Sequence, residues 1–354
     1  MVILHVANIT NNKFNGVCVV VPRHVQAQAQ YAKVALLNLN AERIEGVDEQ
    51  FAAGEDFSLE NLPKPFSLPD IVIFHECYRA PYLKISKQLK KKKIPYVIIP
   101  HGELTNEAQR KKWLKKKVAN FLLFNRFIKG AVAIQCLSER ECDNVRFGKR
   151  KFVGTNGIVL PSIKKSWGDS ESIRIVYVGR LEVNIKGLDI MINAIAKIKD
   201  QLSNKNVEFY IYGPDLNGRF ESVKSLIEEN GVQDIVTLNR EVSGKEKEDI
   251  LLNSDVFMQT SRSEGMPLGI LEALSYGVPV LITKGTTLGE IVEKYDAGWV
   301  SETDSKSLAQ KIIKVLEQKT KFSEKGANAM RLVSENFLWD KISKDAVEKY
   351  KQLI

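Results

Sequence analysis

The chain is poor in cysteine and has no long apolar run. Its four cysteines, in 354 residues, show no C-x-x-C spacing and no neighbouring histidine cluster, which disfavours structural disulfides and structural zinc. Its apolar runs, such as residues 17–21, are far shorter than the ~20 residues that cross a bilayer. The N-terminus lacks the basic start and cleavage site of a secretory signal. These absences predict a reduced, cytoplasmic protein.

Positive charge is concentrated in one stretch. Residues 84–117 carry twelve basic and two acidic residues, so they hold a net charge of +10 against +9 for the whole chain. Two lysine runs lie there, and the second shares a predicted helix with Trp113 and an apolar run at 121–124. Such a helix is typical of proteins that bind an anionic membrane surface. A solvated charged face is the alternative, and no motif for nucleic acid accompanies the patch.

Short apolar segments alternate with longer amphipathic ones along the whole chain, which favours parallel sheets with helical crossovers. The length suggests two domains, at ~150 residues each, and the breaker-rich segment 154–172 reads as a linker. Strands are expected over residues 2–7, 71–74, 96–99, 131–135, 151–153, 173–178, 207–212, 235–238, 256–258 and 278–282. Helices are expected over residues 23–39, 82–92, 107–128, 138–147, 187–199, 220–230, 245–253, 288–294, 305–318, 324–336, from the turn at 261–267 to 276, and from 339 onward.

Two consecutive doubly wound α/β units are therefore predicted. We expect an N-terminal Rossmann-like domain at 1–160, a C-terminal one at 161–336, and a terminal helix at 337–354 that packs back on the first domain. Ligands of such sheets bind at the carboxyl ends of the strands. The two domains would then face each other across one cleft.

The segment 261–273 joins a predicted strand to a predicted helix. Pro267 suits the first helical position, so the backbone N–H groups before and after it would point out of a helix N-terminus and bind oxygen atoms. Glu264 and Glu272 bracket this turn, and carboxylates accept hydrogen bonds from hydroxyls. A polyhydroxylated ligand is favoured over a bare phosphate, and a connection with two solvated glutamates stays an open alternative. The N–H groups concerned are those of Gly265, Met266 and Leu268.

A second segment carries two cations. Gly179 and Arg180 directly follow the predicted strand 173–178, and Lys186 with Gly187 opens the next helix. Arg180 can contact phosphate through two N–H groups, whereas Lys186 acts as a point charge. The flanking glycines allow close backbone approach. An anion site is predicted here, against the alternative of two surface cations.

Three histidines lie in or directly after predicted strands. His101, between Pro100 and Gly102, stands at the expected cleft edge, and we favour a functional role for it over a structural one. His75 has a similar place beside Glu76, and there a structural role is favoured. His5 lies within a strand and is expected in the core.

These motifs resemble the C-terminal domain of retaining glycosyltransferases of family 4, which have the GT-B fold. The resemblance covers nearly the whole second half of the chain. The first half matches less, mainly through residues 98–104, which resemble the His-Gly segment of bacterial polysaccharide-assembling members. The matching segments of the second half are 179–181, 186–189 and the E-x7-E pair, with support from 155–158, 212–214 and 276–280.

The resemblance implies a role for each matching residue. Arg180 and Lys186 would hold the donor diphosphate, and Glu272 would bind the ribose of the nucleotide. Glu264, with the N–H groups of the turn, would hold the transferred hexose, and His101 would approach the sugar near the reacting centre. The donor-binding residues expected in addition are Gly16, Gly179, Gly213, Gly265, Met266 and Leu268.

The family is metal-independent, and the sequence has no Asp-x-Asp pair. Two preplaced cations would neutralise the leaving diphosphate in place of a metal, and no other cofactor is expected. The sequence departs from the family at two places. The loop 11–16 has one glycine where many members have two, and Asp215 stands where a second glycine is frequent, so base recognition stays unassigned.

The implied activity is retaining transfer of a hexose from a nucleoside-diphosphate sugar, with UDP favoured and GDP possible. The acceptor would be lipid-linked or a growing polysaccharide of the cell surface, and the N-terminal domain would face it at the inner face of the membrane. Retention without an enzyme nucleophile implies front-face displacement through an oxocarbenium-like state. The leaving phosphate oxygen would then take the acceptor's proton. A GT-B sugar-nucleotide epimerase and a non-catalytic partner that binds nucleotide-sugar are the alternatives.

Overall fold

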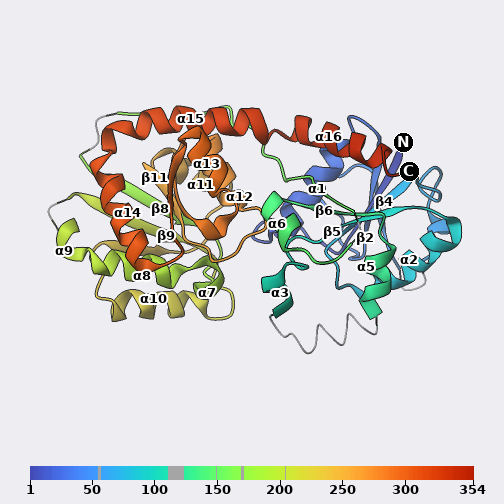
Figure 1. Ribbon diagram of the computed structural model, residues 1–354, viewed down its shortest axis with the longest axis horizontal. Helices are drawn as coiled ribbons and strands as arrows, with labels where there is room; N and C mark the ends of the chain where they lie inside the picture. Colours follow the sequence, from blue (N-terminus) through green and yellow to red (C-terminus); the bar gives the residue numbers. More distant parts are fainter. Residues whose placement is uncertain (55–56, 111–122, 149, 169–170, 204) are drawn as a thin grey trace. The chain divides into compact units, whose positions relative to one another are not determined.

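The computed structural model describes residues 1–54, 57–110, 123–148, 150–168, 171–203 and 205–354. The chain divides into two units, each built on one parallel sheet (Figure 1). Unit 1 comprises Met1–Gly157 and Trp339–Ile354, and unit 2 comprises Ile158–Leu338. The predicted class, two Rossmann-like α/β domains, is confirmed.

Unit 1 contains a seven-stranded sheet with the order β3-β2-β1-β4-β5-β6-β7. The order reverses between β1 and β4, and ligands of open α/β sheets bind outside the strand ends at such a switch point. The strands are β1 (Val2–Ala7), β2 (Lys33–Asn38), β3 (Gln50–Ala52), β4 (Ile71–His75), β5 (Tyr96–Ile99), β6 (Ala133–Cys136) and β7 (Lys151–Val153). The helices are α1 (Gly16–Gln28), η1 (Leu59–Asn61), α2 (Ala80–Lys92), α3 (Asn106–Arg110), α5 (Asn125–Gly130), α6 (Glu139–Asn144) and α16 (Trp339–Lys351).

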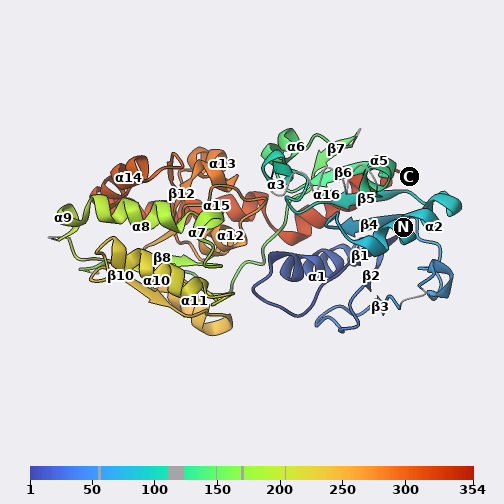
Figure 2. The ribbon, with the colours of Figure 1, turned by 90° about the horizontal axis from the view of Figure 1, so that it is seen from below.

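The helices of unit 1 cover the sheet with apolar faces. β4 is buried along its whole length, as expected of a parallel strand covered on both sides. α2 turns Tyr82, Ile85 and Leu89 into the core, while its lysines face outward. α16 packs against α1 (Figure 2), and the hydroxyl of Tyr31 donates a hydrogen bond to the carboxylate of Asp340.

Unit 2 contains a six-stranded sheet with the order β10-β9-β8-β11-β12-β13. In Figure 1, α8 and α10 lie on one side of this sheet, and α13 and α15 lie on the other. The strands are β8 (Ile173–Val178), β9 (Val207–Tyr212), β10 (Val236–Asn239), β11 (Val256–Gln259), β12 (Val280–Thr283) and β13 (Gly298–Ser301). The helices are α7 (Val183–Lys186), α8 (Leu188–Lys197), α9 (Lys199–Leu202), α10 (Arg219–Glu229), α11 (Gly244–Leu252), α12 (Leu268–Ser275), η3 (Lys284–Thr286), α13 (Gly289–Tyr295), α14 (Ser305–Glu317), η4 (Lys319–Lys321) and α15 (Phe322–Asn336).

One predicted helix of unit 1 was wrong in extent, and a second lies partly outside the described residues. The predicted helix 23–39 runs across the end of α1 and the whole of β2, because the chain turns after Gln28 and its apolar run 34–37 is a buried strand beside β1. The predicted helix 107–128 is represented by α3 and α5, and residues 111–122 lie outside the described residues. Among the described residues, no helix combines the length and apolarity needed to cross a membrane.

The segment predicted as a linker is bound to unit 2. The backbone N–H of Lys165 donates to the carbonyl of Tyr276 at 2.8 Å, and its ammonium lies 3.4 Å from the carboxylate of Asp255. The ring of Trp167 packs near that of Phe322. Lys165 and Trp167 therefore fasten this part of the segment to unit 2.

Candidate functional site

The switch point of unit 2 brings two predicted site loops together. β8 and β11 are neighbours in the sheet, with Val256 opposite Ile175 and Phe257 opposite Val176. The loop after β8 (179–182) carries Arg180 and leads into α7, which ends at Lys186. The loop after β11 (260–267) carries Glu264. Parallel strands end at the same edge of a sheet, which is why these loops meet.

Lys186 and Glu264 form the central contact of this edge. The Lys186 ammonium lies 2.5 Å from Oε1 of Glu264, and both side chains are nearly buried, at 13% and 12% exposed. The same oxygen accepts hydrogen bonds from Oγ of Ser261 at 2.7 Å and Nε2 of Gln259 at 2.9 Å. Oε2 of Glu264 takes part in none of the hydrogen bonds found in the described part of the chain. One carboxylate oxygen is thus fixed while the other remains able to accept from a ligand.

Arg180 lies in the same loop and has a different partner. Its guanidinium contacts the carboxylate of Glu182 at 3.0 Å, and Arg219 of α10 contacts the same oxygen at 2.8 Å. Its backbone carbonyl accepts a hydrogen bond from the Tyr177 hydroxyl at 2.8 Å. Two guanidinium groups on one carboxylate leave an excess of positive charge, and Arg180 is 45% exposed. The loop therefore presents a cation to solvent from a fixed backbone.

Two glycines let these loops approach each other closely. Gly187 has a φ of +65°, and a Cβ there would lie 2.0 Å from the carbonyl oxygen of Thr260. The Thr260 hydroxyl also donates to the Gly187 carbonyl at 2.7 Å. A Cβ on Gly213, after β9, would lie 2.2 Å from the carbonyl oxygen of Gly179. The predicted residues Gly179 and Gly213 therefore meet, and any side chain at Gly213 would push the loop after β8 away.

The turn before α12 differs in one respect from the prediction. Pro267 is the N-cap residue, with extended backbone, and the helix begins at Leu268 instead of at the proline. Gly265, Met266 and Leu268 are partly exposed. Glu272 pairs with Lys247 of α11. The structure thus joins Glu264 to Lys186, while Glu272 and Arg180 each have another partner.

Two predicted site residues belong to unit 1. Gly16 is the exposed first residue of α1, where the side chain of Asn15 caps the N–H of Val17 at 3.0 Å. His101 follows β5 with a φ of +48°, and Gly102 follows with +84°. Histidine is one of the few residues enriched in this left-handed region.

A buried carboxylate holds the turn at His101 in place. Glu141 accepts the N–H of Gly102 at 2.7 Å through one oxygen and that of Leu137 at 2.6 Å through the other. Burial raises the pKa of Glu141, and these two hydrogen bonds oppose that shift. The turn is therefore tied to the end of β6.

Sequence reasoning missed that all four histidines of the chain lie together. The rings of His5, His75 and His101 follow one another through N···N contacts of 2.9 and 3.0 Å, and the ring of His24 lies beside that of His75. Burial lowers the pKa of His5 to about 3, that of His24 to about 4 and that of His101 to about 3, and it lowers that of His75 well below 6.5. These rings are neutral near pH 7. In the sequence, the only indication of this cluster was that three of the histidines lie in or just after predicted strands.

This cluster does not have the form of a metal site. Nε2 of His75 faces His5 and its Nδ1 faces His101, so the ring nitrogens are paired with one another and do not converge on one point. No group of three or more histidine, cysteine, aspartate or glutamate side chains suited to a metal occurs among the described residues. The cluster is instead a linear hydrogen-bonded series.

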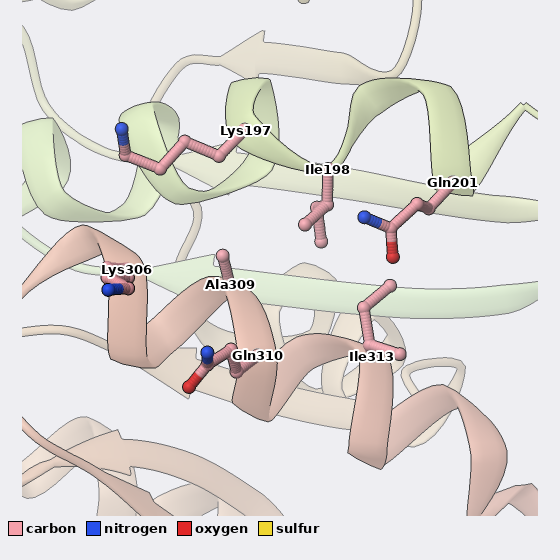
Figure 3. Close-up of a pocket in the computed structure, with 7 residues that line it drawn as sticks. All are labelled: Lys197, Ile198, Gln201, Lys306, Ala309, Gln310 and Ile313. Carbon is pink, nitrogen blue, oxygen red and sulfur yellow. The ribbon is translucent and has the colours of Figure 1, made fainter.

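A groove of about 320 Å³ lies elsewhere on unit 2, between the α8–α9 corner and α14 (Figure 3). Ile198 faces Ala309 and Ile313 of α14 across the groove, and Lys197 and Lys306 stand at one end. It contains none of the predicted site residues and no carboxylate. We assign it no part in the site.

Part of the chain matches a protein-family profile. Residues 161–332 match the profile of the family described as "Glycosyl transferases group 1". The putative colanic acid biosynthesis glycosyltransferase WcaL of Escherichia coli K12 is 30% identical over 147 residues, which are 40% of this chain and 35% of WcaL. The matches to the first curated relatives span between 35% and 46% of their lengths, so they cover less than half of each relative.

Solved structures extend the likeness to both units. Anabaena Alr3699/HepE in complex with UDP has a TM-score of 0.75 at 18% identity, covering 99% of this chain and all of that one. WaaG, a glycosyltransferase involved in lipopolysaccharide biosynthesis, has a TM-score of 0.69 at 15% identity, covering 98% and 99%. At these identities the likeness establishes the fold, which is GT-B. The family match is confined to residues 161–332, which lie within unit 2.

Proposed function

We propose that this protein is a retaining, metal-independent glycosyltransferase that moves a hexose from a nucleoside-diphosphate sugar to a lipid-linked or polysaccharide acceptor. The observation that carries the proposal is the Lys186–Glu264 pair at the switch point of unit 2, within a glycosyl transferases group 1 domain. A cation for phosphate and a carboxylate for sugar hydroxyls stand side by side there. Arg180 supplies a second cation on the same loop.

The chemistry follows from the donors that remain. An ammonium has three N–H donors and a guanidinium has five, so Lys186 and Arg180 keep donors for the diphosphate beyond those given to Glu264 and Glu182. Negative charge grows on the leaving phosphate as the glycosidic bond breaks. Preplaced cations stabilise that charge without reorganisation. The leaving oxygen then takes the acceptor's proton, and the sugar keeps its configuration.

The substrate class is inferred from the relatives. UDP is the favoured nucleotide, because Alr3699/HepE was solved with UDP and has the same fold. A cell-surface polysaccharide or lipid-linked acceptor is favoured by WcaL, named for colanic acid biosynthesis, and by WaaG, named for lipopolysaccharide biosynthesis. Glu272 is proposed for the ribose and Glu264 for the hexose. His101 is proposed to contact the transferred sugar.

A donor screen tests this function. The protein is incubated with UDP- and GDP-sugars, with and without a membrane extract, and released nucleoside diphosphate is measured. We expect release that depends on the extract, and a glycoside product whose anomeric proton in the NMR spectrum matches the donor's configuration. Conversion of the donor sugar without an acceptor would indicate an epimerase. No turnover with any donor, despite donor binding, would favour a non-catalytic partner.

We also propose that the basic patch 84–117 holds the protein on an anionic membrane surface at the inner face of the cell membrane. Within its described part, residues 84–110, Lys84, Lys87 and Lys91 of α2 are exposed on the face opposite the buried core side chains of that helix. Residues 111–117 of the patch lie outside the described residues. Each lysine near an anionic surface contributes about 1 kcal/mol.

Vesicle sedimentation measures this attachment. We expect binding to vesicles with anionic lipid at low salt, its loss at high salt, and an affinity reduced by about 10²-fold when Lys84, Lys87 and Lys91 all become Gln. The matched control changes three lysines on α14 of unit 2 and leaves the affinity unchanged. Equal losses of vesicle affinity in the two triple variants would contradict binding through the basic patch 84–117. The control positions are Lys306, Lys311 and Lys314.

A further inference from the structure

A series of hydrogen bonds runs through unit 1 to His101. Nε2 of His5 lies 3.0 Å from Oε1 of Gln28, Nδ1 of His5 lies 2.9 Å from Nε2 of His75, and Nδ1 of His75 lies 3.0 Å from Nε2 of His101. We call these four residues the histidine wire. Gln28, His5 and His75 are 0% exposed, and His101 is partly exposed. The wire thus leads from the core of the unit to its surface.

The strand register explains why the rings meet. In the pairing of β1 with β4, His5 stands opposite Ile73. Side chains two residues apart in a strand share a face, so His75 projects on the same side as Ile73. The rings of His5 and His75 stack with centroids 5.2 Å apart, and those of His75 and His101 with centroids 5.3 Å apart.

The inner end of the wire has a fixed hydrogen-bond direction. Nε2 of Gln135 donates to the carbonyl of Gly154 at 2.9 Å, so its Oε1 accepts the hydroxyl proton of Tyr350 at 2.6 Å. The Tyr350 oxygen can then offer only a lone pair to Gln28, with which it interacts. Nε2 of Gln28 is buried and has no hydrogen-bond partner of ordinary geometry in the described part of the chain, Tyr350 included. Gln28 turns its Oε1 toward Nε2 of His5 at 3.0 Å, and the opposite orientation would set its oxygen against the lone pair of Tyr350.

Each neutral imidazole has one N–H and one lone pair, so this direction propagates outward. Oε1 of Gln28 requires a proton on Nε2 of His5, which leaves Nδ1 of His5 as an acceptor. That nitrogen requires a proton on Nε2 of His75, whose Nδ1 then accepts from Nε2 of His101. We infer that the histidine wire holds His101 as the neutral Nε2–H tautomer, so that its Nδ1 presents a hydrogen-bond acceptor to a ligand hydroxyl.

His75, His5 and Gln28 are therefore positioning residues that act through His101. The wire does not store a proton, because the amide oxygen of Gln28 cannot take one and the buried rings resist charge. An acceptor at Nδ1 suits a sugar hydroxyl and repels a phosphate oxygen. The chemical choice of ligand group rests on the proposed function, whereas the tautomer does not.

Nuclear magnetic resonance of protein with ¹⁵N-labelled histidine rings tests the wire near pH 7. We expect His101 with a protonated Nε2 and an unprotonated Nδ1. We also expect one ¹⁵N–¹⁵N coupling across each of the two N–H···N hydrogen bonds, His101–His75 and His75–His5. Packing without a hydrogen bond does not produce such a coupling. A proton on Nδ1 of His101, an imidazolium at that position, or absent couplings would overturn the inference.

Two variants separate the wire from simple burial. His75→Phe keeps a ring in place and is expected to abolish both couplings and to lower sugar transfer about tenfold, as expected for a loosened contact group. His24→Gln changes a neighbouring buried ring that is hydrogen-bonded to Asn156 instead, and it should leave both couplings and the transfer rate unchanged. Loss of the couplings in both variants would contradict the inference. Couplings in a protein that transfers no sugar would leave the wire standing and refute the proposed function.

Discussion

Replacing Arg180 with Ala is expected to lower the rate of nucleoside diphosphate release by about 10²–10³-fold, the usual effect of removing one preplaced donor from a developing charge. The protein should stay folded, because the carboxylate of Glu182 keeps its 2.8 Å contact with Arg219. Lys186→Ala is a less clean change, since it would leave the nearly buried carboxylate of Glu264 without its cation. Initial rates with the donor found in the screen give the measurement.

Arg174 provides the matched control. It lies at the other end of β8, is 48% exposed and pairs with Glu208 at 3.3 Å, so it resembles Arg180 in exposure and in having a glutamate partner. Arg174→Ala should change the rate less than twofold, because an exposed ion pair of this kind contributes little. Equal rates for the two variants would show that Arg180 has no special place in the reaction.

Acidification is expected to destabilise unit 1 selectively. The folded-state pKa values of His5 and His24 are lowered by burial to about 3 and about 4, and that of His75 is lowered as well. The unfolded chain then binds more protons than the folded one once the pH falls below ~6.5, so the free energy of unfolding decreases with decreasing pH. At about pH 5 the loss is about 2 kcal/mol for each of His5 and His24.

Two buried carboxylates oppose this trend in part. Burial raises the pKa of Glu103 and of Glu141, so the folded state gains protons there as the pH falls. The histidine contribution begins as the pH falls below ~6.5. The net change between about pH 7 and about pH 5 is expected to be a loss of several kcal/mol.

Unit 2 is an internal control, since all four histidines lie in unit 1. Urea titrations at the two pH values, read by pulsed deuterium labelling of β1 and β4 against β8 and β11, give the stability of each unit. We expect the urea midpoint of unit 1 to fall much more than that of unit 2. His24→Gln should reduce the difference by about 2 kcal/mol. Parallel losses in both units would rule out the histidines as the cause.

The sequence predicted well which loops of unit 2 carry Arg180, Lys186 and Glu264, because the signals for these loops are local. Gly179-Arg180 follows one apolar strand, and Glu264 follows another. In each case the residues that indicate the strand and the turn lie within a few positions of the candidate residue. The position of the strands in the sheet then brought Lys186 to Glu264, as parallel strands of a switch point require. The partners of the charges, such as Glu182 for Arg180, could not be predicted because they depend on loop conformation.

The histidine wire was beyond sequence reasoning for a different reason. His5 stands in an apolar strand and reads as a core residue, which it is. Its contact with His75 depends on the register of β1 with β4, and its link to Gln28 depends on how α1 packs on the sheet. Neither leaves a local pattern. The helix expected over 23–39 also hid Gln28, because it placed the end of α1 within a longer element.

A crystal structure with bound UDP is the most direct test of the central claim, that two cations on the loops of unit 2 neutralise the leaving diphosphate. We predict that β-phosphate oxygens accept hydrogen bonds from the guanidinium of Arg180 and the ammonium of Lys186. A diphosphate bound elsewhere, with Arg180 still paired only to Glu182 and Lys186 only to Glu264, would contradict the account.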